Sequence, residues 1–275
     1  MIGGDAFLSI EQLEPVEIVV LGYQAEPYLR FDVDGTVSEN RRSPAVWLNQ
    51  ERYGTEEPPE FASADARPEW SQVATNGRFS WHDHRSHWMN PAPPPSAQAG
   101  DQVLEATVPI QVNGQQVIVT VASFLLDEPS MFPSLLGGIA GLALGLFAWQ
   151  AGRVPRTLIG LMAAGAAALV GFVAFRSVPA ETQPSQLLWV LPVIAMAAAI
   201  VVLVTRNRTA TTVYLDGLAV VAGASLAGWA VFRIDALTRA LIPSNTPAVI
   251  DRLAIATVLG VGVILAIRGL SLIHI

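Results

Sequence analysis

The chain has 275 residues, of which 52% are hydrophobic and 14% charged, and its mean hydropathy of +0.43 is above the range of soluble globular proteins. Its formal net charge is −7, with 19 of the 23 acidic residues before residue 131, and such an acidic chain lacks the basic surface that a nucleic acid requires. It has no cysteine, which excludes disulfides, thiolate nucleophiles, iron–sulfur clusters and blue-copper sites.

The first part of the chain has the features of a β-rich domain. Short β-branched or aromatic segments, separated by proline, glycine and acidic residues, predict strands at Ala6–Ile10, Val16–Leu21 and Tyr28–Asp32. Ser43-Pro44 predicts the start of a short helix through about Tyr53, with serine as N-cap and proline in the first turn.

The strongest turn signal lies near the end of this part. Asn113-Gly114 separates two alternating runs, Val103–Val112 and Gln115–Leu126, and therefore predicts a type I′ hairpin. We expect residues 1–127 to form an all-β, sandwich-like domain, here called the head.

Three of the four histidines fall within one stretch of the head, Trp81-His82-Asp83-His84-Arg85-Ser86-His87-Trp88-Met89. In a straight strand, His82 and His84 would lie on one face, and His87 and Met89 on the other. A turn or bulge near Arg85-Ser86 would bring all four together. Three imidazoles and a thioether suit copper better than magnesium or calcium, so this set is a candidate metal site.

Two other interpretations of the stretch stay open. In the first, Asp83 and Arg85 form an ion pair, Arg85 stacks on Trp81 or Trp88, and the histidines bond to backbone carbonyls as parts of a structural network. In the second, His84 or His87 works with Asp83 as an acid–base pair. No nucleophile motif accompanies them, so an enzyme is the least favoured class.

A second polar cluster contains Glu26, Arg41 and Arg42. These residues are candidates for binding a carboxylate, a lipid headgroup or a partner loop, and equally for salt bridges that fasten the loops. Together with Trp81, Asp83, Arg85 and Trp88, they define a candidate surface for docking an envelope protein.

Five apolar segments of about 18–20 residues follow the head, each long enough as a helix to cross a bilayer core. They span residues 131–149, 157–175, 187–204, 213–232 and 249–267. Five such segments leave no polar face for water, so residues 128–269 are predicted to form a transmembrane bundle.

The loop arginines slightly favour a head outside the cell. Asp127-Glu128 precede the first span, and Arg153 and Arg156 follow it, as the positive-inside rule expects for that orientation. An exported head requires a signal segment, and the chain opens without one, so we expect the natural N-terminus to lie further upstream. At the other end, Leu270–Ile275 matches the translation of a sequencing-library adapter, so His274 is not counted as a ligand.

The spans carry few polar groups. Asp216 is the one ionisable residue clearly within a span, and it is a candidate either for pairing with Arg206, Arg208 or a neighbouring helix, or for a proton relay. Asp251-Arg252 has the pattern of an interfacial pair. Small-residue spacings such as Gly137/Gly141/Gly145 predict close helix packing rather than a pore.

The head's polar segments carry a family resemblance. The residues concerned are Gly22-Tyr23, Glu26–Arg30, Asn40–Pro44, Leu48-Asn49, Arg52–Gly54, Trp81–Arg85 and His87–Met89. Over roughly residues 5–150 the chain resembles a group of actinobacterial membrane proteins. The resemblance implies a signal peptide, an exported β-rich domain and C-terminal transmembrane helices, and it implies no activity.

Overall fold

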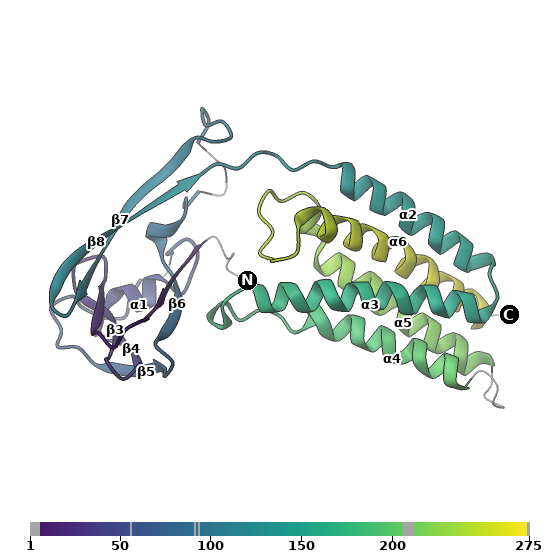
Figure 1. Cartoon of the computed structure of the whole chain (residues 1–275), viewed down its shortest axis with the longest axis horizontal. Coiled ribbons are helices and arrows are strands. Elements are labelled where there is room, and N and C mark those ends of the chain that lie inside the picture. Colours follow the sequence, from purple (N-terminus) through teal and green to yellow (C-terminus); the bar gives the residue numbers. More distant parts are fainter. Residues whose placement is uncertain (1–5, 56, 91, 93, 206–211, 274–275) are drawn as a thin grey trace. The chain divides into compact units, whose positions relative to one another are not determined.

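The structure is a computed structural model, which describes residues 6–55, 57–90, 92, 94–205 and 212–273. It divides into two compact units: residues 1–127 with the segment 179–183, and residues 128–178 with 184–275. The first unit contains the strands and the second contains five long helices (Figure 1). The predicted fold class, an all-β sandwich-like domain followed by a five-helix transmembrane bundle, is confirmed.

The head is built on an antiparallel sheet with the strand order β5-β4-β3-β2-β7-β8. These strands are β2 (Ile18–Leu21), β3 (Pro27–Phe31), β4 (Val37–Asn40), β5 (Trp70–Ala74), β7 (Gln102–Val112) and β8 (Gln115–Phe124). The hairpin predicted at Asn113-Gly114 joins β7 to β8, and both turn residues have positive φ, +48° and +77°. Positive φ at both positions is the requirement of a type I′ turn.

A second, two-stranded antiparallel sheet pairs β1 (Phe7–Glu11) with β6 (Arg78–His82), with Phe7 opposite His82. Trp81 and partly buried side chains of β1 pack into one hydrophobic core with Leu29 and Phe31 of β3, which are fully buried. Burial of a side chain of this size contributes about 1.5–3 kcal/mol. This shared core holds β6, and hence the histidine stretch, against the main sheet.

The predicted helix after Ser43 is present but shorter than expected. Helix α1 covers Pro44–Leu48, and the Ser43 hydroxyl accepts a hydrogen bond from the Ala45 amide, as an N-cap does. The expectation that it extends to Tyr53 is wrong. The helix ends at Asn49, whose side chain is held by tyrosines of the head and whose carbonyl turns toward His82.

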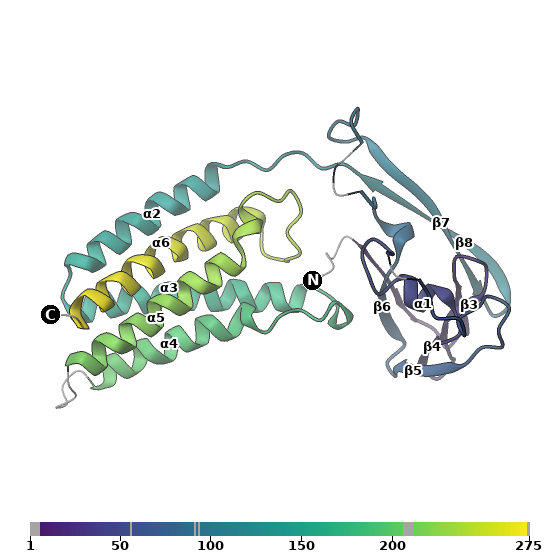
Figure 2. The same ribbon diagram turned by 180° about the vertical axis from the view of Figure 1, so that it is seen from behind.

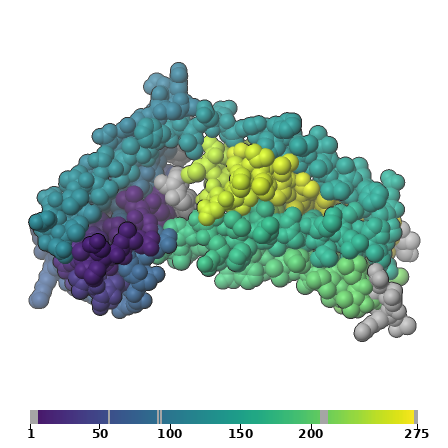
Figure 3. Space-filling view, viewed as in Figure 1, coloured from purple at the N-terminus to yellow at the C-terminus, as the bar shows by residue number. Residues whose placement is uncertain are grey.

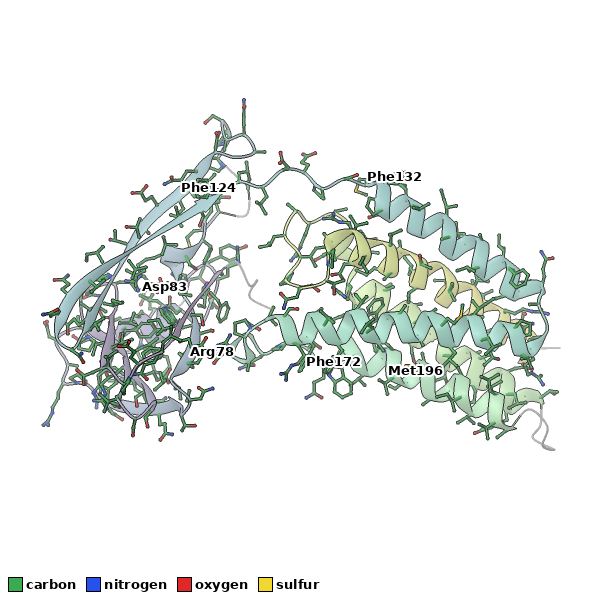
Figure 4. The ribbon with its side chains drawn as sticks, in the orientation of Figure 1. Arg78, Asp83, Phe124, Phe132, Phe172 and Met196 are labelled. Atoms are coloured by element: carbon green, nitrogen blue, oxygen red, sulfur yellow. The ribbon has the colours of Figure 1, made fainter. Side chains whose placement is uncertain are left out.

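The second unit consists of α2 (Phe132–Gln150), α3 (Arg153–Ser177), α4 (Leu187–Thr205), α5 (Thr212–Phe232) and α6 (Ala248–Ile273). All five are long and apolar enough to cross a membrane, and no more than 44% of the most apolar part of each is buried within the bundle. Many of the other apolar side chains are exposed, as Phe172 on α3 illustrates (Figure 4). An apolar outer surface of this extent requires a lipid environment, so the chain is an integral membrane protein.

The predicted small-residue packing is found between α2 and α6, which lie side by side (Figures 1 and 2). A Cβ atom added at Gly141 would lie 2.5 Å from the Thr257 carbonyl oxygen, and one added at Gly137 would lie 2.6 Å from that of Leu253. The two backbones therefore approach closely only because these α2 positions lack side chains.

Ion pairs lie near the ends of the bundle helices. Asp216 of α5 pairs with Arg153 at the start of α3, 3.5 Å away, whereas Arg206 and Arg208 lie outside the described residues. The expected Asp251-Arg252 pair is wrong: Asp251 pairs with Arg233, 2.7 Å away, because the end of α5 brings that guanidinium to the start of α6. Arg252 instead donates to the carbonyls of Ala236 and Arg239.

Candidate functional site

The histidine stretch bends where the sequence analysis required a kink. Strand β6 ends at His82, and His84–Ser86 form a single 3₁₀ turn. Asp83 caps this turn: its carboxylate accepts the Arg85 amide, and its carbonyl accepts both the amide and the hydroxyl of Ser86. The bend carries His87 back toward His82, so that their rings stack with centroids 5.1 Å apart.

Asp83 is the structural centre of the stretch. Its side chain, labelled in Figure 4, is fully buried and accepts hydrogen bonds from Arg85 Nε at 2.9 Å, Arg85 Nη2 at 2.8 Å and Trp81 Nε1 at 2.9 Å. Burial alone would raise the pKa of Asp83, but the Arg85 guanidinium outweighs it and holds that pKa below its usual range. The predicted Asp83–Arg85 pair is therefore present.

The expected stacking of Arg85 on Trp81 or Trp88 is wrong. The guanidinium lies over the Tyr23 ring, with Arg85 Cζ 4.8 Å from the ring centroid, and it also donates to the Leu21 carbonyl. Trp81 cannot offer its face because its ring is buried in the hydrophobic core.

Two tyrosines and Asn49 complete the surroundings; their segments carry the family resemblance, but the sequence alone assigned them no role in the site. The Tyr23 hydroxyl donates to Asn49 Oδ1 and accepts the His84 amide, and Asn49 Nδ2 donates to the Tyr28 hydroxyl. Burial raises the pKa of both tyrosines, which remain neutral. No local pattern marks Asn49, because its role depends on contacts across more than twenty residues.

The structure brings the three imidazoles together. The ring centroid of His84 lies 5.0 Å from that of His82 and 6.0 Å from that of His87. Each ring has one nitrogen at a backbone carbonyl: His82 Nδ1 is 2.8 Å from the Asn49 oxygen, His84 Nε2 is 2.9 Å from the Glu51 oxygen, and His87 Nδ1 is 3.1 Å from the Trp88 oxygen. A carbonyl only accepts, so each of these nitrogens must carry the proton of its ring.

His82 and His87 also contact each other, with their Nε2 atoms 2.9 Å apart. The two rings thus make three polar contacts: His82 with the Asn49 carbonyl, His82 with His87, and His87 with the Trp88 carbonyl. Each contact needs one proton, yet two neutral imidazoles carry only two N–H protons between them. One contact is repulsive unless an additional proton or a metal ion supplies a positive charge. Burial lowers the pKa of His82 to about 4, so a third proton is disfavoured at neutral pH.

The other predicted site residues are placed differently. Met89 is half-buried in the irregular segment after the turn, and Trp88 is exposed. Among the described residues, no group of three or more histidine, aspartate or glutamate side chains is arranged to hold a metal ion. The histidines therefore stand as a close pair, His82 and His87, with His84 beside it.

Much of the candidate docking surface lies in the interior. Trp81, Asp83 and Glu26 are buried, and the Glu26 carboxylate accepts the Ser43 hydroxyl and the Gln24 amide. Arg42 forms an exposed ion pair with Glu69 at 2.9 Å, and Arg41 is exposed. Solvent therefore reaches only part of the surface formed by these residues.

No protein-family model, curated protein or solved structure matches the chain.

Proposed function

We propose that this integral membrane protein binds a transition-metal ion between His82 and His87 of its head, and that copper is the preferred metal. The observation that carries the proposal is the Nε2–Nε2 separation of 2.9 Å between two rings whose other nitrogens lie at backbone carbonyls. A cation between the two Nε2 lone pairs turns the one repulsive contact into two favourable bonds.

The backbone carbonyls that bond the second nitrogen of each ring favour a metal ion over a shared proton between His82 and His87. Histidines that bind metals usually donate their second N–H to a backbone carbonyl or carboxylate, which fixes the tautomer and the ring orientation. His82 and His87 both have this arrangement, and so does His84 through the Glu51 carbonyl. A pair of histidines that shares a proton requires only two oriented rings, whereas here His84 is oriented in the same way as a third.

The spacing favours copper(II) among the imidazole-binding metals. Metal–nitrogen bonds of about 2.05 Å place two nitrogens about 2.9 Å apart at a right angle and about 3.3 Å apart at a tetrahedral angle. The His82–His87 spacing matches the right angle, which belongs to tetragonal copper(II) rather than to tetrahedral zinc. His84, after a small movement, and Met89 are the candidates for further ligands.

The membrane setting supports a role in binding or handling the metal at the bacterial envelope. Arg153 and Arg156 lie at the start of α3, directly after the first span, and by the positive-inside rule this arginine pair supports a cytoplasmic location for that end of the bundle. The head precedes the first span, so this orientation would put it on the extracytoplasmic side, which is part of the proposal.

The competing functions have less support. A catalytic His84–Asp83 pair needs the carboxylate on an imidazole N–H, but His84 Nε2 contacts the Glu51 carbonyl, and the Asp83 oxygens accept from Arg85 and Trp81. A docking site for another envelope protein would rest on Arg41 and Trp88, since the other residues of that set are buried or paired.

Calorimetric titration of the full chain in detergent with copper(II) and zinc tests the proposal. We expect one copper ion per chain, weaker zinc binding, and at least tenfold weaker copper binding in His87→Gln. His274→Ala is the matched control, because it removes the one histidine outside the cluster and should leave binding unchanged. Equal copper binding by the chain and by His87→Gln would refute the proposal.

A further inference from the structure

Strand β8 is an unprotected sheet edge. It is the last strand of the main sheet, and no other strand of the described chain pairs with its outer side. Nine consecutive residues of β8 pair in register with β7, from Gln115 to Ser123, so β8 is a long strand. Figure 3 shows the β7–β8 hairpin in blue-green along one margin of the head.

The side chains of β8 do nothing to block that edge. The sequence Gln-Gln-Val-Ile-Val-Thr-Val-Ala-Ser-Phe contains no charge and no proline, and Val117, Ile118 and Val119 are 43%, 54% and 41% exposed. Soluble sheet proteins protect such edges with charges, prolines, bulges or a covering segment, because a free edge accepts strands of other chains. A long, apolar and uncovered edge therefore indicates a strand partner.

We propose that β8 pairs with β8 of a second copy of this chain, in antiparallel orientation, to form a continuous sheet across a dimer. The charge distribution supports a second copy as the occupant. The head is strongly acidic, whereas residues 115–126 carry no charge, so this edge is where two acidic heads approach with least repulsion. An edge that docks a basic partner would be expected to carry acidic side chains, and residues 115–126 carry none.

The sequence of β8 is complementary to itself in this orientation. Centring the pair on Val119 places Val117 opposite Val121 and Ile118 opposite Thr120, so that every central pair is β-branched. The polar ends of one strand, Gln115 and Gln116, then face Ser123 and Ala122 of the other. Antiparallel pairing of identical strands has twofold symmetry, the commonest closed symmetry of protein oligomers.

The absence of cysteine makes a sharp test possible. In Val119→Cys the chain carries a single thiol, so a crosslink between two copies must join their two positions 119, and directly opposed positions lie about 5 Å apart. In Gln115→Cys the two thiols would be separated by eight residues, about 27 Å along the strand. Each full-length variant, in native membranes, is treated with a short bifunctional maleimide and run on a denaturing gel.

The expected result is a band at twice the chain mass for Val119→Cys and its near absence for Gln115→Cys. Adding Ile118→Lys and Thr120→Lys to Val119→Cys should abolish the band, and these exposed positions should leave the thermal midpoint unchanged. Equal crosslinking at both positions would indicate unspecific association, and a crosslink of Val119→Cys to a different protein would indicate another partner. Either result, or no crosslink at all, would overturn the proposal.

Discussion

Asp83 and Arg85 form a two-pronged ion pair in the head, with Nε–O and Nη2–O distances of 2.9 and 2.8 Å and no solvent exposure of the carboxylate. The same carboxylate caps the turn that carries the histidines. The pair therefore links the stability of the head to the geometry of the candidate metal site.

Replacing Asp83 with Asn should destabilise the head by about 3–5 kcal/mol, because it leaves the largely buried Arg85 guanidinium without its counter-charge. Chemical denaturation followed by tryptophan fluorescence measures this loss. Arg42→Gln is the control, since it breaks the exposed pair with Glu69 and should cost less than about 1 kcal/mol. Similar losses in the two variants would contradict the role given to Asp83.

Acidification should destabilise the metal-free head as His82 becomes protonated. The pKa of His82 is about 4 in the folded head, below the ordinary value of 6.5, so the unfolded chain binds the proton first as the pH falls. The stabilising contribution is complete above pH 6.5 and is lost between pH 6.5 and about 4, by an amount on the order of 3 kcal/mol.

Thermal unfolding of the full chain between pH 7.5 and 4 with a chelator present tests this dependence. His82→Gln cannot titrate, so its stability should change less over the same window. An unchanged slope in His82→Gln would assign the pH dependence to another group.

Gly54 should be sensitive to substitution because it lies against His84. A Cβ atom at Gly54 would be 2.5 Å from His84 Cε1, and the residue has φ of +58°. Gly54→Ala should therefore cost more than the roughly 1–2 kcal/mol of backbone strain alone, and should also weaken copper binding by displacing the ring. Gly100→Ala supplies the comparison, because Gly100 also has positive φ but nothing lies within 4 Å of the added atom. Equal stability and equal copper affinity of the two variants would contradict the expected contact.

Gly141→Leu should lower the thermal midpoint of the full chain in detergent, because its side chain would enter the α6 backbone at Thr257. Gly138→Leu introduces the same side chain on the same helix where nothing lies within 4 Å, and it should have little effect. The close packing of α2 on α6 would be doubtful if the two midpoints were the same.

Local chemistry explains which parts of the fold could be predicted. Asn113-Gly114 specifies a hairpin, Ser43-Pro44 specifies a helix start, and the length and hydropathy of five segments specify spans, since each signal lies within a few neighbouring residues. Strands β4 and β5 were not predicted, because Val37–Asn40 and Trp70–Ala74 are short and have no clear alternation.

The candidate site was predictable in its members but not in its contacts. Clustering of histidines identified His82, His84 and His87, and the need for a kink pointed to the residues of the 3₁₀ turn. The carbonyls of Asn49 and Glu51 could not be foreseen, because every residue has a carbonyl and only the folded chain selects two of them. The same applies to Tyr23, whose ring contacts Arg85, 62 residues further along the chain.

The most direct test of the central claim is electron paramagnetic resonance of the full chain loaded with one equivalent of copper(II). The pair of imidazoles predicts a tetragonal signal with hyperfine coupling to at least two nitrogens, reduced to a single nitrogen or lost in His87→Gln and unchanged in His274→Ala. A spectrum of weakly bound aqueous copper, or one that His87→Gln leaves unchanged, would contradict a metal site between His82 and His87.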